Sequence, residues 1–431
     1  MKKRVLQLLI LSALVHTGLM AQQSTAIIDK NETARIEKYL SSDELEGRRT
    51  YSKGIEKAAA FIANEFKQTG LQTFNHSDNY LQKFTRTNVK FVSASGSLDG
   101  IALPTKNLIV ITASPSFSID ETSGYELVKI NKEDNFGASV RKILTANKNA
   151  LVLVDESMAN MFGRLTQLKS NISAQQKSIV FVLGNTAPIK YHIEATHKIE
   201  ELGLANVVGV IPGKSLPNEY VIFSGHYDHL GINTNNMQNG DSIYNGANDD
   251  AAGTTAMIML SKYFKKLNNN ERTLVFVAFT AEEVGGFGAQ YFSKQFDPAT
   301  VKAMFNLEMI GTESKWGKNS AYITGYEKTN MGEILQKNLE GSTFKFYPDP
   351  YTEQNLFYRS DNATLARLGV PAHTISTSKM DSEPNYHKAS DQFETLDMDN
   401  MNEIIKAIAI SARSIISGKD TPTRVDTTQL K

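Results

Sequence analysis

From Asn206 onward, short apolar runs alternate with amphipathic segments of helical length, and this alternation restricts the fold more than any other feature. Runs such as LVFVAF at 274–279 are apolar throughout, which is typical of strands buried on both faces of a parallel sheet. Segments such as AAGTTAMIMLSKYFKKL at 251–267 carry apolar residues at helical spacing. This order predicts the α/β class, with a mostly parallel central sheet flanked by helices.

The individual elements of this region follow from the same patterns. NVVGVIPG at 206–213 and EYVIFSGHYDH at 219–229 are expected to form two paired strands. The last helix closes a domain that we expect to span residues 205–418. Further strands are expected at 272–281, 301–311, 321–326 and 370–377, and helices at 251–267, 285–296, 331–339, 362–369 and 401–416.

The segments outside this region predict the organisation of the remaining chain. Residues 22–83 carry apolar residues at helical spacing and are expected to be the N-terminal part of the same domain. Residues 84–204 change to short strand-like runs with one helix-like stretch, so we expect an inserted smaller α/β domain. It resembles a protease-associated domain but lacks the glycine-rich signatures, and a structural elaboration is the alternative. Residues 419–431 are expected to be a disordered tail.

The first 21 residues have the features of a secretory signal peptide. A basic start precedes an apolar stretch at 5–20 and the small residue Ala21, which fits cleavage after that residue. The alternative is a membrane anchor, but the stretch is shorter than the about 20 apolar residues of a spanning helix, and His16 and Thr17 interrupt it. We therefore expect a secreted or periplasmic protein with no membrane attachment after cleavage.

The composition excludes several classes of function. Lys plus Arg and Asp plus Glu number 46 each, so the basic excess of nucleic-acid-binding proteins is missing, and we expect no nucleic-acid partner. The chain contains no cysteine, which removes disulfides, thiol nucleophiles, cysteine metal ligands and a bacterial lipoprotein anchor. The sequence does not indicate an oligomeric state.

Polar clusters stand where the expected strands end or the helices begin. Each has an ordinary explanation by itself, such as a helix cap or a solvated first helical turn. Because the carboxyl ends of parallel strands lie at one edge of a sheet, their joint occurrence indicates a common site. The clusters are GHYDHLG with His226, Asp228 and His229, NGANDDAAG with Asp249 and Asp250, TAEEVGG with Glu282 and Glu283, NLEMIG with Glu308, and YHKASDQFETLD with His387.

The residue types in these clusters match the preferences of a metal ion. Two histidines and three carboxylates are a set that one or two zinc ions accept when no thiolate is present. A carboxylate shared between two ions about 3.5–4 Å apart is the usual centre of a two-metal hydrolase site. A further acid, close by but not bound to metal, is needed to remove a proton from water.

Taken together, the motifs GHYDHLG, GANDDAAG, TAEEVGGFGA, NLEMIG and YHKASD resemble, in order and spacing, those of the co-catalytic di-zinc aminopeptidases of metallopeptidase family 28, and of its secreted bacterial members. ELEGRR and NVVGVIPG are also similar to segments of that family. The resemblance covers residues 32–75 and 205–415 and extends to all five motifs.

The resemblance implies two zinc ions per chain and distributes the ligands between them. His226 and Glu308 would bind one ion, Glu283 and His387 would bind the other, and Asp249 would bridge the two. The family usually has aspartate in place of Glu308, and the extra methylene of glutamate puts the geometry of the first metal site in question. The peptide bond after Asp249 is typically cis in this family.

Two further acids receive roles from the same resemblance. Asp228 would fix the tautomer of the His226 imidazole from behind the metal site, and Glu282 would be the general base. In TAEEVGG, Gly285 and Gly286 would let the backbone turn into the next helix. FYRSDN at 357–362 is expected near the site, although a helix cap there is an equal alternative.

The expected function is therefore a secreted zinc-dependent exopeptidase, an aminopeptidase that hydrolyses N-terminal residues from peptides through a di-zinc-activated water. One alternative is a glutaminyl cyclase-like enzyme with a single zinc, although all five ligand positions are filled here. A second is a non-catalytic interaction module of the same fold, which would have lost ligands or the base. Carboxypeptidase specificity also occurs in the wider family, and no motif reports the preferred terminal residue.

Overall fold

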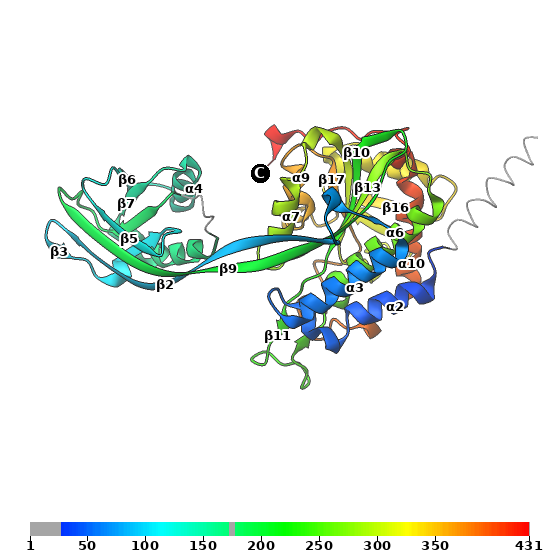
Figure 1. Cartoon of the computed structure of the whole chain (residues 1–431), viewed down its shortest axis with the longest axis horizontal. Coiled ribbons are helices and arrows are strands. Elements are labelled where there is room, and N and C mark those ends of the chain that lie inside the picture. The colour runs from blue at the N-terminus through cyan, green and yellow to red at the C-terminus, as the bar shows by residue number, and fades with distance from the viewer. Residues whose placement is uncertain (1–26, 172–176, 431) are drawn as a thin grey trace, which may run out of the picture. The chain divides into compact units, whose positions relative to one another are not determined.

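The structure is a computed structural model that describes residues 27–171 and 177–430. The expected signal peptide, residues 1–21, lies outside these ranges. In the described part of the chain, no helix combines the length and apolar character needed to cross a bilayer. The chain divides into two compact units, one with the residues up to Phe84 and from Leu204 onward, the other with Thr85–Gly203 (Figure 1).

The first unit is built on a mostly parallel sheet, which confirms the expected α/β class. At its centre, β10 pairs in parallel with both β13 and β14, and β14 pairs in parallel with β17. Antiparallel pairs occur towards the edges, between β13 and β9 and between β15 and β17. The strand order is β16 (Lys345–Pro348), β15 (Ser320–Ile323), β17 (Ala372–Ser376), β14 (Val301–Leu307), β10 (Leu216–His226), β13 (Arg272–Phe279) and β9 (Tyr191–Ile211), and β1 (Gln72–Thr73) also pairs with β9.

The expected pairing of 206–213 with 219–229 is wrong, because β13 lies between these strands. Leu274 of β13 is opposite Ile211 of β9 on one side and Val221 of β10 on the other. The connection after β9 crosses the start of β13 instead of making a hairpin. Gly213 approaches the backbone of 271–273 so closely that a Cβ there would lie 2.4 Å from a carbonyl oxygen.

Helices cover both faces of this sheet (Figure 1). Side chains alternate between the faces along each strand. Phe223 of β10 therefore faces one layer, where its ring stacks on Phe276 and Phe305, and the next residue back, Ile222, faces the other. One layer contains α2 (Lys30–Leu40), α3 (Lys53–Thr69), α6 (Ala252–Leu267), α8 (Met331–Asn338), α10 (Met398–Ser411) and α11 (Arg413–Ile416), and the other contains α7 (Phe287–Ser293) and α9 (Asn362–Ala366).

The tail is ordered where the structure describes it, so the expectation of disorder for 419–431 is wrong for 419–430. Val425 is buried, and its N–H donates to the carbonyl of Gly369. The guanidinium of Arg424 donates to the carbonyl of Val301 at 2.8 Å. These contacts are made by a polar segment, which is why its composition alone suggested disorder.

The second unit contains its own four-stranded sheet with the order β4-β8-β7-β6. The strand-like runs at 108–111, 150–154 and 179–183 form three of its strands, and the helix-like run at 158–168 forms one short α-helix and a 3₁₀ segment. Whether this unit is related to protease-associated domains stays a prediction. Its elements are β2 (Leu81–Leu98), which begins in the first unit, β3 (Ile101–Ala102), β4 (Leu108–Ile111), β5 (Ser116–Asp120), β6 (Glu126–Ile130), α4 (Phe136–Ala146), β7 (Ala150–Val154), α5 (Ala159–Phe162), β8 (Ile179–Leu183) and the first part of β9.

Candidate metal centre

The expected site residues meet at the carboxyl ends of the central strands, in one pocket with an empty volume of about 550 Å³. This is the edge at which parallel α/β sheets hold their ligands. The elements explain the convergence, because three of the clusters directly follow neighbouring strands. His226 ends β10, Glu282 and Glu283 follow β13, Glu308 follows β14, Asp249 precedes α6, and His387 lies in the loop between β17 and α10.

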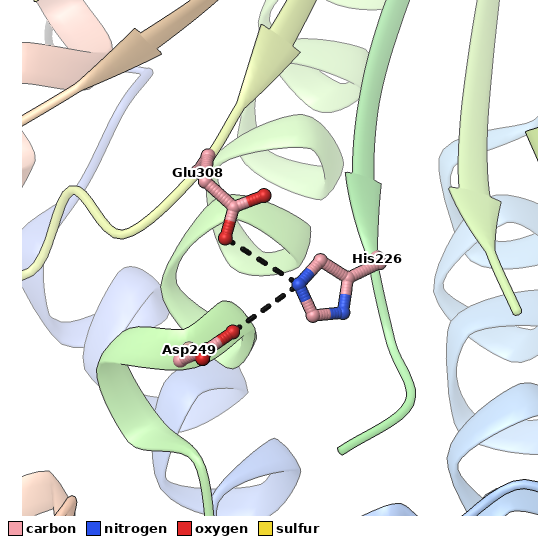
Figure 2. A group of neighbouring side chains, drawn as sticks. All are labelled: His226, Asp249 and Glu308. Atoms are coloured by element: carbon pink, nitrogen blue, oxygen red, sulfur yellow. Dashed lines mark ion pairs between the residues drawn. The ribbon is translucent and has the colours of Figure 1, made fainter. Parts of the chain in front are cut away.

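Two of these carboxylates lie on either side of one imidazole nitrogen. Figure 2 shows His226 with Nε2 turned toward Asp249 and Glu308. Nε2 is 3.2 Å from Oδ1 of Asp249 and 3.4 Å from Oε1 of Glu308. The three side chains can place one ligand atom each within 4.8 Å of one another, so Glu308 brings a carboxylate oxygen into the same group as His226 and Asp249.

The second oxygen of Asp249 faces a different histidine. Nε2 of His387 is 3.2 Å from Oδ2 of Asp249 and 3.3 Å from Oε2 of Glu283. Asp249 is buried, and its peptide bond to Asp250 is cis. One carboxylate therefore presents one oxygen to each of two ligand groups, as a bridging ligand must.

A third histidine, His229, joins the second group although no metal role was expected for it. Its side chain is fully buried, and Nδ1 lies 2.8 Å from Oε1 of Glu283 and 4.0 Å from Oδ1 of Asp249. His229, Asp249 and Glu283 can each place one ligand atom within 4.8 Å of the other two. The only indication of a role for His229 in the sequence was its place in GHYDHLG, three residues after His226.

The electrostatics of the centre show an excess of negative charge. Burial opposes the protonation of His226, but the carboxylates of Glu308, Asp249 and Glu282 outweigh it and raise the pKa of His226 well above its usual value. Against the same effect of burial, Asp249 and Glu283 raise the pKa of His387 to about 10. The cluster therefore stabilises positive charge at its centre, which is what a divalent cation would supply.

Asp228 supports the site differently from what we expected. Nδ1 of His226 is 3.0 Å from the backbone carbonyl of Asp228 but 3.8 Å from its carboxylate. The carboxylate instead accepts hydrogen bonds from the N–H groups of Glu282 at 3.0 Å and Glu283 at 3.3 Å, and from the hydroxyl of Thr50 at 3.2 Å. Asp228 thus fixes the His226 tautomer through its backbone and holds the two-glutamate segment through its side chain.

The turn that carries these glutamates depends on backbone conformations with positive φ. Gly285 has φ 123° and Gly286 has φ 66°, as expected for the residues that lead into α7. Ala281 also has a positive φ of 60°, immediately before the pair. The N–H groups of both glycines donate to the carbonyl of Glu282, so the turn is closed around the first glutamate.

Asp250 is a buried carboxylate that ties three segments together, a role not expected from the sequence. It accepts hydrogen bonds from the N–H groups of His226 at 3.0 Å, Gly253 at 3.0 Å and Met309 at 3.1 Å. These belong to the end of β10, the start of α6 and the segment after β14. Asp250 therefore fixes the backbone next to the candidate ligands His226, Asp249 and Glu308. Asp249 instead presents its carboxylate oxygens to the two ligand groups.

The segment FYRSDN supports the first ligand group through a hydrogen bond to Glu308. The hydroxyl of Ser360 donates to Oε2 of Glu308 at 2.7 Å, and Nδ2 of Asn306 donates to Ser360 at 2.8 Å. Arg359 and Ser360 line the pocket, and Asp361 makes no side-chain cap hydrogen bond to α9. The segment therefore lies at the site, and the helix-cap alternative is wrong for Asp361.

A buried arginine of ELEGRR joins the loops behind the centre. The guanidinium of Arg48 donates to four backbone carbonyls, those of Leu40, Tyr227, Asn245 and Gly246. The carbonyls of Asn245 and Gly246 shortly precede Asp249 in the chain, and the carbonyl of Tyr227 lies between His226 and Asp228. Arg48 thus links the N-terminal helices to both loops that carry candidate ligands.

The donor set fits zinc. It consists of imidazole nitrogens and carboxylate oxygens in two groups that share one carboxylate, a combination typical of zinc in the absence of cysteine. Both ring nitrogens of His229 and Oε1 of Glu283 are buried without a hydrogen bond of good geometry, although the two side chains are in contact. Such polar atoms are costly unless a ligand or a cation completes their environment.

Comparison with known families and proteins adds relatives of this region. Residues 206–411 match the family described as "Peptidase family M28". A probable leucine aminopeptidase of Trichophyton verrucosum is 31% identical over 211 residues, which are 47% of this chain and 54% of that protein. A probable zinc metalloprotease of Pyrenophora tritici-repentis is 28% identical over 183 residues, 41% of each chain. The chain thus spans about half the length of these curated relatives, or less.

Solved structures share the fold at low sequence identity. An aminopeptidase from Aneurinibacillus sp. strain AM-1 superposes with a TM-score of 0.54 at 16% identity, covering 95% of this chain and 98% of that one. BSAP, a zinc aminopeptidase from Bacillus subtilis, has a TM-score of 0.53 at 14% identity, covering 91% and 96%. These similarities confirm the central sheet flanked by helices.

Proposed function

We propose that this protein is a zinc-dependent exopeptidase, an aminopeptidase that hydrolyses N-terminal residues from peptides, in agreement with the match of residues 206–411 to peptidase family M28. The position of Asp249 carries the proposal. Its two oxygens face different histidines, each with a second carboxylate, so the side chain can bridge two ions. Zinc ions bound in these two groups would polarise the scissile carbonyl and lower the pKa of a water molecule.

Glu282 is the acid that remains for proton transfer. It lines the pocket beside both ligand groups without belonging to either. Burial, followed by the charges of Asp361, Glu308 and neighbouring Glu283, raises the pKa of Glu282 well above its usual value, against the effect of His226. Zinc ions bound in the two ligand groups would lower the pKa of Glu282. Glu282 can then accept the proton of the attacking water and pass it to the leaving amine.

The position of the two glutamates separates their tasks. The Asp228 carboxylate holds the N–H groups of both Glu282 and Glu283, so the segment is fixed although the side chains have different surroundings. Glu283 has an imidazole at each oxygen, at 2.8 Å and 3.3 Å, and is placed as a ligand. Glu282 makes no ion pair with a histidine among the described residues, which leaves its carboxylate available for substrate protons.

The place of action is a further part of the proposal. The sequence at 1–21 supports export, and we propose that the mature enzyme acts outside the cytoplasm on peptides with a free amino terminus.

The test combines metal analysis with a mutation of the proposed base. The full chain should contain two zinc ions by elemental analysis and hydrolyse aminoacyl-anilides, with loss of activity on chelation. Glu282→Gln should lower turnover by about 10²–10⁴-fold while two zinc ions stay bound. Glu340→Gln, at an exposed position on the same unit, should behave as wild type.

The outcomes separate the alternatives. Wild-type turnover in Glu282→Gln would remove the general-base assignment. A single zinc ion per chain, together with cyclisation of N-terminal glutamine, would favour the glutaminyl cyclase-like reaction. Absence of both reactions in a chain that holds zinc would favour an interaction module.

A further inference from the structure

The pocket contains one permanently cationic side chain, that of Arg359. Its other ionisable lining residues are the acidic and histidine candidate ligands, Glu282, Tyr322 and Tyr386. Arg359 stands next to Ser360, whose hydroxyl is bonded to Glu308, so its backbone is anchored to the first ligand group. Its side chain is exposed on the pocket wall.

The surroundings hold this guanidinium in place without neutralising it. Its Nη1 donates to Oε1 of Gln354 at 3.4 Å, and Nε2 of Gln354 in turn donates to the carbonyl of Met380 at 2.9 Å. Within the described ranges, Arg359 forms no ion pair with a carboxylate at 4 Å or less. A charge with only a neutral partner at the edge of a pocket can take an anionic one from a ligand.

The charge balance of the proposed enzyme leads to the same conclusion. Four carboxylates, those of Asp249, Glu282, Glu283 and Glu308, line the pocket, and two zinc ions would cancel their four charges. Arg359 adds a further positive charge at the pocket wall, outside both ligand groups. A substrate with only an ammonium group would leave the Arg359 charge without an anionic partner, whereas a substrate that also carries a carboxylate would supply one.

We infer that Arg359 forms a carboxylate-binding subsite, so that the enzyme prefers substrates with a carboxylate beyond the scissile bond. The inference rests on the proposed aminopeptidase function and adds a substrate class to it. A guanidinium binds a carboxylate through two parallel hydrogen bonds, which orients the ligand as well as attracting it. The carboxylate can be the C-terminus of a dipeptide or the side chain of an acidic second residue, and the two sources are separated by experiment.

The first measurement compares substrates that differ only in one carboxylate. For the C-terminal source, kcat/KM is measured for Leu-Gly and Leu-Gly-amide, and for the side-chain source, for Leu-Glu-amide and Leu-Gln-amide. Wild type should prefer the acid in one pair by about tenfold or more, mainly through KM. Arg359→Gln should lower that ratio by about tenfold, and Arg367→Gln, an exposed arginine on the same unit but outside the pocket, should retain it.

The second measurement does not require turnover. Calorimetric binding of the same four compounds to Glu282→Gln and to the double variant Glu282→Gln with Arg359→Gln should show the same preference and its loss. An equal affinity for acid and amide in both pairs, or a preference that survives Arg359→Gln, would overturn the subsite. A wild-type chain that binds the acid more tightly but cleaves neither these compounds nor the aminoacyl-anilides would refute the proposed function and keep the subsite.

Discussion

Nδ1 of His229 lies 2.8 Å from Oε1 of Glu283, while Oε2 of the same glutamate faces His387 at 3.3 Å. Each oxygen of Glu283 therefore has its own imidazole. His387 is partly exposed and projects into the pocket, whereas His229 is fully buried behind it. Glu283 therefore lies between an imidazole that projects into the pocket and a buried imidazole in contact with it, as expected for a proposed metal ligand that a buried neighbour orients.

Replacing His229 should weaken one metal site and spare the other. In His229→Asn, the buried partner of Glu283 is lost, and the affinity for one zinc ion should fall about 10–100-fold. Zinc competition against a chelator, in which two binding steps are resolved, measures this effect. The exposed His192→Asn variant should match wild type, and two unchanged affinities in His229→Asn would show that His229 does not orient the ligand.

The hydroxyl of Ser360 should act on the other metal site. It donates to Oε2 of Glu308 at 2.7 Å, so Ser360→Ala frees the carboxylate to rotate. We expect the zinc ion shared with His226 to bind about tenfold more weakly or worse, with the other step unaffected. The exposed Ser382→Ala provides the control, and equal weakening of both steps would indicate a general disturbance instead of a local one.

The guanidinium of Arg48 should be essential for stability. Lysine cannot reach all four carbonyls that Arg48 serves. The carbonyl of Gly246 also accepts from the N–H of Ala251, but each of the other buried carbonyls that loses its donor costs about 1–3 kcal/mol. Arg48→Lys should therefore lower the free energy of unfolding by about 3 kcal/mol or more, measured by urea denaturation. The adjacent, exposed Arg49→Lys should change it by less than about 0.5 kcal/mol. Equal stabilities of both variants would contradict the role of Arg48 as a link between loops.

The buried His373 should make the fold sensitive to acid. Burial lowers the pKa of His373 from 6.5 to about 4, and both ring nitrogens have partners, the carbonyl of Thr324 and the hydroxyl of Thr329. Its stabilising contribution is complete above pH 6.5 and is lost as the pH falls towards 4, because the unfolded chain takes up a proton first. The loss approaches about 1.4 kcal/mol per pH unit within this window.

The measurement for His373 is a comparison of pH profiles. The free energy of unfolding of His373→Gln should fall less between pH 6.5 and 4 than that of wild type, while the exposed His76→Gln should follow wild type. Parallel profiles for wild type and His373→Gln would mean that other groups cause the acid sensitivity.

The convergence of the proposed ligands was predictable because each of these residues belongs to a local motif of the chain. His226 and Glu308 end apolar runs, Asp249 starts a helix, and the order of such motifs along the chain carries the resemblance. The supporting residues were not predictable in this way. Ser360 meets Glu308 across 52 residues, and Asp250 joins N–H groups from three separate segments, so neither contact leaves a pattern in its own neighbourhood.

The amino-acid sequence alone predicted the α/β class, the positions of most strands and the residue types that meet at the centre, because apolar periodicity and side-chain type act locally. Three-dimensional packing settled the rest. It placed β13 between β9 and β10, buried Val425 of a polar tail, and replaced the expected Asp228 carboxylate by its carbonyl behind His226. These outcomes depend on which distant segments fill the same space and satisfy each other's polar groups, and such competition is resolved only in the folded chain.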